Sequence, residues 1–260
     1  MKSVAIINQK GGVGKTTTVT NTGAALASRG HKTLIVDLDP QGNLTQGLGI
    51  KTDTLPKSIY HLLTGEISAP SEIIQNVQKN LDILPSNLYL AGAEHTLSNT
   101  PGGELVLREL FEHPDIQAYD YLLVDCPPSL GKLTINALVA VDSVIITVEA
   151  EFYALQGVAT LFTSINMVQK RINPNLKVLG AVITKYDGRQ KLHREVQDAV
   201  RTTFGKSVFK STIRKNVDLA GAPAQGATIF DFRPGSYGAE DYRAFADELL
   251  ETLEVKHVHG

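Results

Sequence analysis

Two lysines, three glycines and two threonines share one short turn near the N-terminus. The stretch runs Gln9-Lys-Gly-Gly-Val-Gly-Lys-Thr-Thr17. Glycines let successive backbone N–H groups point toward one centre, which suits an anion. Lys15 would add a full positive charge beside the outer phosphates of a nucleotide, and the Thr16 hydroxyl could bind Mg²⁺. The turn therefore predicts a site for a nucleoside triphosphate.

Three carboxylates stand just after apolar stretches. Asp37 closes the run 32–37, Asp39 follows two residues later, and Asp125 closes the run 119–125. Open α/β sheets place ligands beyond the carboxyl ends of their strands. Each acid alone is a weak signal, but together with the glycine-rich turn they predict a ligand site at this edge, with Asp125 on the Mg²⁺ side of the phosphates.

Apolar runs alternate with helical patterns through most of the chain, and they have to position these groups. Strands are expected at 2–8, 32–37, 81–84, 119–125, 143–148 and 178–184, and helices at 15–29, 58–63, 104–113, 130–140, 154–170 and 237–253. This alternation predicts an α/β fold: a mostly parallel, twisted sheet flanked by helices on both faces. Residues 44–100 are less regular and are interpreted as an insertion packed on the core, with a loop or short helix at 87–94. We expect a single domain over residues 1–260.

The composition excludes several classes of protein. The chain has 260 residues, a net charge of −2 and one cysteine, Cys126. This balance argues against a histone-like basic protein, and a single cysteine argues against a disulfide framework, so a reducing compartment is expected. No stretch approaches the roughly 20 apolar residues of a membrane span, and the N-terminal run is too short for a signal peptide.

Positive charge is concentrated in residues 185–215. This segment holds nine Lys and Arg residues against three acidic ones, a net charge of +6, so the remainder of the chain is acidic. Such clustering suits a polyanion, and phosphate contacts carry no sequence information, which favours non-specific DNA binding. A solvated helix face explains the same pattern equally well, so the residues alone leave both interpretations open.

The glycine-rich turn departs from the standard P-loop at Gln9, where the pattern has glycine. It resembles the deviant Walker A motif of the ParA/MinD group of P-loop ATPases, and Asp37-Leu-Asp-Pro-Gln-Gly-Asn43 resembles that group's second motif. Further stretches along the chain are similar to the chromosomal ParA branch, often called Soj.

The resemblance implies a role for each matching residue. Lys10 would be the signature lysine, which reaches the ATP of a partner subunit. Asp39 would position and polarise the attacking water, and Asp37 would support the Mg²⁺ shell. The implied sites are catalytic for Lys10, Lys15 and Asp39, nucleotide-binding for Lys10, Gly11, Gly12, Val13, Gly14, Lys15, Thr16, Thr17 and Asn216, and metal-binding for Thr16, Asp37 and Asp125.

The same resemblance implies a partition ATPase that uses ATP and Mg²⁺. The ATP-bound homodimer would bind DNA non-specifically, and a ParB-like centromere-binding partner would stimulate hydrolysis and release. DNA contacts would come from Arg189, Lys210, Arg214 and Lys215. The sequence departs from the family at Asp218, where close relatives have arginine. The implied location is cytoplasmic and associated with the nucleoid.

Two other functions fit parts of the sequence. A positioning ATPase with the same fold could place a protein cargo other than a chromosome on the nucleoid. Recruitment to a membrane is not expected, because the tail after Leu253 lacks a lysine-rich amphipathic pattern. A metabolic P-loop enzyme, such as a reductase or synthetase, is disfavoured, because Cys126 alone cannot hold an iron–sulfur cluster and no second substrate site is evident.

Overall fold

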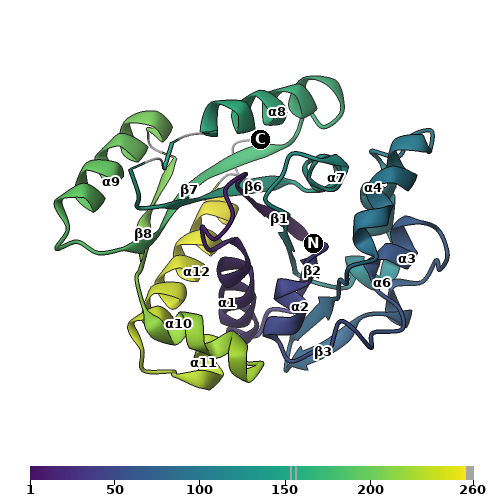
Figure 1. The fold of residues 1–260 in the computed structure, drawn as a ribbon, viewed down its shortest axis with the longest axis horizontal. Coiled ribbons are helices and arrows are strands. Elements are labelled where there is room, and N and C mark those ends of the chain that lie inside the picture. The colour runs from purple at the N-terminus through teal and green to yellow at the C-terminus, as the bar shows by residue number, and fades with distance from the viewer. Residues whose placement is uncertain (153, 156, 206, 256–260) are drawn as a thin grey trace.

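An eight-stranded sheet forms the centre of the molecule, and helices cover both of its faces (Figure 1). The computed structural model describes residues 1–152, 154–155, 157–205 and 207–255. The strands lie in the order β3-β4-β2-β5-β1-β6-β7-β8, and all neighbours are parallel except β3 and β4. Their bounds are Lys2–Ile7 (β1), Thr33–Asp37 (β2), Gln75–Gln78 (β3), Leu81–Leu84 (β4), Tyr121–Asp125 (β5), Ser143–Glu149 (β6), Lys177–Tyr186 (β7) and Val208–Arg214 (β8).

The helices form two layers. Their bounds are Lys15–Ser28 (α1), Asn43–Gly47 (α2), Ile59–Leu63 (α3), Leu90–Asn99 (α4), Val106–Phe111 (α5), Pro114–Gln117 (α6), Lys132–Ala140 (α7), Val158–Arg171 (α8), Lys191–Phe204 (α9), Val217–Gly221 (α10), Ile229–Phe232 (α11) and Tyr237–Val255 (α12). Short 3₁₀ turns lie at Pro70–Glu72 (η1) and Ala222–Gln225 (η2). Helices α1 and α12 pack together on one face, while α4, α5, α7 and α8 help to cover the other (Figure 1).

The sheet explains why its central strands are almost wholly apolar. Every residue of β2 and β5 is buried, because helices cover both faces, and apolar side chains pack into a separate core on each side. This architecture confirms the α/β fold predicted from the alternating pattern.

The strand order brings the predicted chemical groups to one edge. Strand β1 lies between β5 and β6, and β5 also pairs with β2. Asp37 lies opposite Asp125 in the β2–β5 register, and Ile6 lies opposite Asp125 on the other side. The carboxyl ends of these strands therefore surround the glycine-rich turn that follows β1.

Several elements differ from the expectation. Residues 44–100 are no insertion, because β3 and β4 extend the sheet itself. Within the range 87–94, expected to be a loop or short helix, α4 begins at Leu90 and runs on to Asn99. Helix α8 begins at Val158 rather than at residue 154.

The elements that were not predicted include β3, α9 and β8, besides the short helices α2, α6, α10 and α11 and the turns η1 and η2. Strand β3 was missed because its sequence, Gln-Asn-Val-Gln, is polar and only partly buried at the sheet edge. In the basic segment, charged residues mask the regular apolar spacing of α9. Strand β8 buries only two residues and so has no alternating apolar pattern. Within the described part of the chain, no helix has the length and apolar character needed to cross a bilayer.

Candidate nucleotide-binding site

The loop between β1 and α1 forms an open cradle. Gly12 and Gly14 adopt the left-handed region, with φ of 76° and 85°, which other residues enter only with strain. A Cβ atom built on Gly11 or Gly12 meets no atom within 4 Å, so the space over this loop is empty. Helix α1 begins directly after Gly14 and presents its unpaired N–H groups to that space. The arrangement suits a chain of phosphates.

Buried side chains hold the cradle from both sides. The Asn8 amide donates to the Thr147 carbonyl on β6 at 2.6 Å, and its oxygen accepts from the Lys10 N–H at 2.9 Å. On the other side, the Thr184 hydroxyl donates to the Val13 carbonyl at 2.9 Å. No local pattern marks Asn8 or Thr184, because the carbonyls to which they donate, on Thr147 and Val13, lie 139 and 171 residues away in the sequence.

The two loop lysines lie in different environments. Lys15 is 6% exposed, and its ammonium donates to the Lys10 carbonyl at 3.3 Å. Burial lowers the pKa of Lys15, opposed by the nearby carboxylates of Asp125 and Asp39. The Lys10 side chain is 40% exposed and forms ion pairs with Glu149 and Glu151 at the end of β6. Lys15 thus faces the inside of the site, and Lys10 faces its outer side.

The two strand-end carboxylates are fully buried. Asp37 accepts hydrogen bonds from the Thr45 N–H at 2.9 Å and the Thr45 hydroxyl at 2.6 Å. Burial raises the pKa of Asp37 to about 7, although the bonds from Thr45 oppose this shift. Burial and the neighbouring Asp37 likewise raise the pKa of Asp125 well above its ordinary value. The surroundings of both carboxyls therefore disfavour the negative form, and a cation bound nearby would stabilise it.

The environment of Asp125 fits a magnesium ion. Both carboxylate oxygens are buried and have no hydrogen-bond partner among the residues that the structure describes. The Thr16 hydroxyl lies close enough to lower the pKa of this carboxyl. Mg²⁺ prefers hard oxygen ligands and keeps several waters and phosphate oxygens, so it needs few protein groups. Thr16 and Asp125 would hold the ion, and Asp37 would support it through its negative charge.

Asp39 lies beyond β2, in a loop whose shape is fixed. Its side chain accepts from the Gln41 N–H at 3.0 Å, and its own N–H donates to Asp37 at 3.2 Å. The Ser86 hydroxyl donates to the Asp39 carbonyl at 2.8 Å. Asp39 is also largely buried, so its side chain has little freedom to move.

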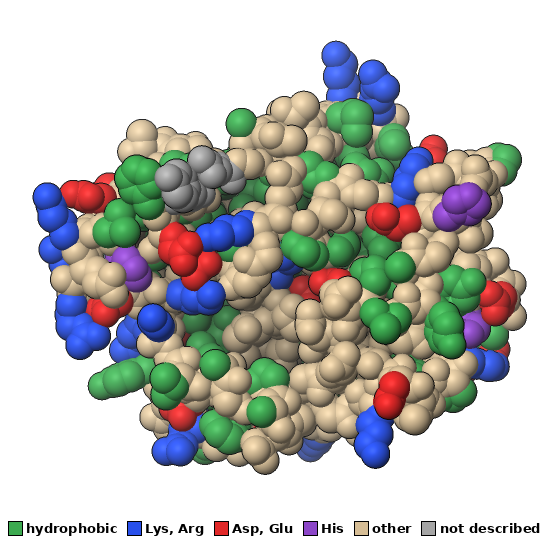
Figure 2. All heavy atoms as spheres, viewed as in Figure 1, with side chains coloured by type: hydrophobic (Ala, Val, Ile, Leu, Met, Phe, Trp, Pro, Cys, Tyr) green, Lys and Arg blue, Asp and Glu red, His purple; other side chains and the backbone are tan. Residues whose placement is uncertain are grey.

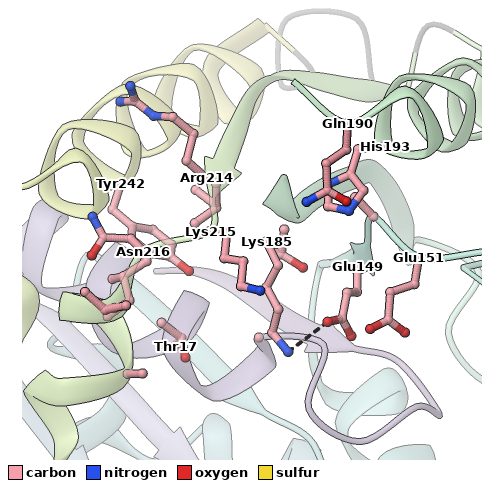
Figure 3. Close-up of a pocket in the computed structure, with 17 residues that line it drawn as sticks. Thr17, Glu149, Glu151, Lys185, Gln190, His193, Arg214, Lys215, Asn216 and Tyr242 are labelled. Atoms are coloured by element: carbon pink, nitrogen blue, oxygen red, sulfur yellow. Dashed lines mark ion pairs between the residues drawn. The ribbon is translucent and has the colours of Figure 1, made fainter. Parts of the chain in front are cut away.

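A cavity of about 630 Å³ opens beside the cradle (Figure 3). It is bounded by Gly14 and Thr17 at one end and by the loop after β8, which carries Asn216 and Val217. The Asn216 side chain accepts from the Asp218 N–H at 2.7 Å and so fixes the start of α10. The cavity has room for a nucleoside, and Asn216 lies in its wall.

The predicted DNA residues are spread over β8, its following loop and the turn before α9. Arg189 is almost fully exposed and binds Asp187 through two hydrogen bonds. The Arg189 guanidinium lowers the pKa of Asp187. Lys210 and Lys215 are exposed. Figure 2 shows blue side chains gathered over the region of α9; Lys206, part of the basic count, lies outside the described residues.

Arg214 differs from the other three. Its guanidinium pairs with Asp241 and Glu240 on α12 and lies over the Tyr237 ring, 4.3 Å from the ring centre. The hydrogen bond to Asp241 raises the pKa of Arg214 further. Its charge is therefore already matched within the chain, and it joins β8 to α12.

Comparisons with known proteins agree with this geometry. A family model described as an AAA domain matches residues 1–178. The sporulation initiation inhibitor protein Soj of Bacillus subtilis is 44% identical over 95% of this chain and 98% of its own length. The chromosome-partitioning ATPase Soj of Thermus thermophilus is 43% identical over 98% and 97%.

Solved structures show the same fold. A cobyrinic acid a,c-diamide synthase from Mycobacterium smegmatis, with bound ATP analogue and magnesium, superposes with a TM-score of 0.86 at 38% identity, covering 98% of this chain and 96% of that one. A putative plasmid partition protein from Borrelia burgdorferi, bound to AMPPNP, gives 0.80 at 26% identity, covering 96% and 98%. With these matches along nearly its whole length, the chain belongs to the ParA/Soj family of P-loop ATPases, enzymes that hydrolyse ATP with Mg²⁺.

Proposed function

We propose that this chain is an ATP-driven partition ATPase whose two copies close around ATP. One observation carries the proposal: the Lys15 side chain is buried inside the loop, while the Lys10 side chain is 40% exposed on the outer side of the same loop. Lys15 would bind the phosphates of its own subunit. A second copy facing this edge would receive Lys10 at its own nucleotide. ATP would then supply the negative charge that joins the two subunits.

Hydrolysis in this proposal depends on positioning and electrostatics. The cradle and Lys15 hold the phosphates, and Thr16 and Asp125 hold the Mg²⁺ that neutralises them. Asp39 orients the attacking water, and Lys10 of the second copy stabilises charge that develops at the bond being broken. Each role falls on a group that the fold fixes before the nucleotide binds.

DNA would bind to the ATP dimer through Arg189, Lys210, Lys215 and Arg214. Arg189, Lys210 and Lys215 are exposed on one side of the molecule, toward the β8 edge of the sheet. Lysine and arginine contacts to phosphates make binding independent of sequence and sensitive to salt. A ParB-like partner would then stimulate hydrolysis, which releases the ATPase from DNA.

The test is binding to random-sequence duplex DNA with ATP, with ADP and without nucleotide, over a series of salt concentrations. Asp39→Ala would hold the ATP state. We expect tight binding with ATP alone, falling steeply with salt. Lys215→Ala should weaken it, whereas Lys79→Ala, an exposed lysine at the opposite edge of the sheet, should not. Equal binding in all three nucleotide conditions would overturn the proposal.

A second candidate is a positioning ATPase for a protein cargo. It is favoured by the matched charge of Arg214 and by Asp218 in the neighbouring loop, which reduce the positive charge at this end of the surface. ATP-dependent dimers that bind no DNA would favour this candidate. The activity in the name of the Mycobacterium relative would instead require ATP hydrolysis that responds to an amide donor and not to DNA.

A further inference from the structure

Four charged side chains form a cluster between the cradle and the cavity. Glu149, at the end of β6, forms an ion pair through each carboxylate oxygen. Lys185 lies 2.9 Å from one oxygen (Figure 3). Lys10 lies 3.6 Å from the other. Lys10 also pairs with Glu151, two residues further along. Lys10 is thus held within its own subunit by two carboxylates.

The two carboxylates differ in how they respond to losing Lys10. The Glu151 side chain is 54% exposed, so water can replace Lys10 there at small cost. The Glu149 side chain is only 10% exposed, and a buried carboxylate without a partner is unfavourable. Glu149, however, keeps Lys185 after Lys10 leaves. The cluster can therefore release Lys10 without stranding a buried charge.

Lys185 is held in place by the backbone. Its φ is 53°. Lys185 is one of two non-glycine residues in the left-handed region within the described chain. Such a conformation costs free energy and persists where the surroundings impose it. Lys185 lines the cavity together with Lys215, and its ion pair with Glu149 lies within one subunit, so it does not depend on Lys10.

We propose that Glu151 and Glu149 form a switch that holds Lys10 in its own subunit until ATP draws it to a second copy. The inference rests on the proposed function, because it assumes that Lys10 acts across the dimer. A triphosphate carries more negative charge than one exposed carboxylate, so Lys10 exchanges one anion for a stronger one. Without ATP the facing subunit offers no such anion, and Lys10 of each subunit stays paired with Glu149 and Glu151 of the same subunit.

The first part of the test uses nucleotide-free protein and reads the ion pair directly. The hydrogen bond to Glu151 raises the pKa of Lys10, which keeps the amine protonated and slow to react. Glu151→Gln removes this partner, and we expect Lys10 to be acetylated by an N-hydroxysuccinimide ester roughly two- to fivefold faster, as measured by mass spectrometry. Glu72→Gln is the matched control. It removes the carboxylate that pairs with Lys57 in a similarly exposed ion pair and leaves the ion pairs of Lys10 intact.

The second part measures dimer formation against ATP concentration by light scattering, with Asp39→Ala in every protein. Because Glu151→Gln removes a contact that must break, its dimer should form at a roughly two- to fivefold lower ATP concentration. Glu72→Gln should form dimers at the same concentration as the protein with Glu72. Because the Glu151 side chain is exposed, its substitution should not unfold the protein, and loss of folding would not explain either result.

Two results would overturn the switch. One is unchanged acetylation of Lys10 in Glu151→Gln. The other is dimer formation at an unchanged or higher ATP concentration, which would mean that Glu151 contributes nothing or stabilises the dimer itself. A protein that stays monomeric with ATP, whatever stands at position 151, would overturn the proposed function and the switch together. Dimers that form with ATP but ignore the substitution would overturn the switch alone.

Discussion

Asp39 is the residue whose removal should separate binding from hydrolysis. Its backbone is fixed by Asp37 and Ser86, while Lys15 and the cradle would hold the phosphates independently. Asp39→Ala should reduce ATP hydrolysis about a hundredfold or more, since a group that positions and activates water is worth about that much. Fluorescent ATP should bind with nearly unchanged affinity.

The control for Asp39 is Asp53, an exposed carboxylate in the segment after α2. Asp53→Ala should leave phosphate release unchanged. If Asp39→Ala hydrolysed ATP at the rate of the unaltered protein, the water-positioning role would be wrong.

Cys126 should be unreactive despite standing next to Asp125. The side chain is buried, and burial raises the pKa of its thiol above the ordinary value. The thiolate is the reactive form, so raising the pKa lowers reactivity throughout the neutral range. We expect a disulfide reagent at pH 8 to modify Cys126 only after the addition of denaturant. Rapid modification of the native protein would contradict this environment.

Helix α1 lies unusually close to the sheet at Gly23. A Cβ atom at this position would lie 2.7 Å from Cγ2 of Ile35, a stiff branched side chain that is fully buried. Alanine favours a helix over glycine by about 1 kcal/mol, but overpacking costs about 1–3 kcal/mol. Gly23→Ala should therefore lower the free energy of unfolding by roughly 1 kcal/mol, as measured by urea denaturation.

Gly92 in α4 provides the matched comparison. A Cβ atom there would lie 3.7 Å from the Tyr60 ring, an ordinary contact distance. The helix preference for alanine then acts without a clash, and Gly92→Ala should raise the free energy of unfolding by up to about 1 kcal/mol. The same direction of change in both variants would mean that α1 has room to move away from β2.

Arg214 and Lys215 are neighbours with different expected effects. Arg214 joins β8 to α12 through Asp241, whose side chain is mostly buried, so Arg214→Ala should destabilise the protein by about 1 kcal/mol. Lys215 is exposed, and Lys215→Ala should change stability by less than about 0.5 kcal/mol while weakening DNA binding. Thermal unfolding and DNA binding, measured on both variants, separate the two contributions.

Patterns formed by neighbouring residues could be recognised in the sequence, whereas contacts between distant residues could not be predicted from it. The glycine-rich turn and the apolar runs ending in Asp37 and Asp125 are local patterns, and they predicted the sheet edge where the site lies. Glu149 and Glu151 were missed as partners of Lys10, because they become neighbours only when β6 pairs with β1. Strand order depends on packing of the whole chain, which no local pattern specifies.

The missed helix α9 is a different case, since its signal was present. Val196, Val200 and Phe204 recur every four residues, and all three are buried. The many charges between them suggested a solvated basic segment, so the apolar spacing was not interpreted as a helix. Strand β8 likewise buries only Phe209 and Ile213 between partly exposed residues.

At the scale of the molecule, the chain should unfold as one unit. The single sheet runs from β3 to β8, and α12 packs against both α1 and β8, so distant parts of the sequence share each layer. We expect one thermal transition, with the same midpoint by circular dichroism and tyrosine fluorescence. Two separated transitions would contradict the expectation of one domain over residues 1–260.

The position of β1 has a consequence for the protein during its synthesis. The first strand made has as neighbours β5 and β6, which end at residues 125 and 149, and Thr18 in α1 bonds to Tyr242 near the other end of the chain. A growing chain on the ribosome therefore carries the cradle sequence long before anything holds it in shape. It should gain affinity for nucleotide only late, when translation is nearly complete.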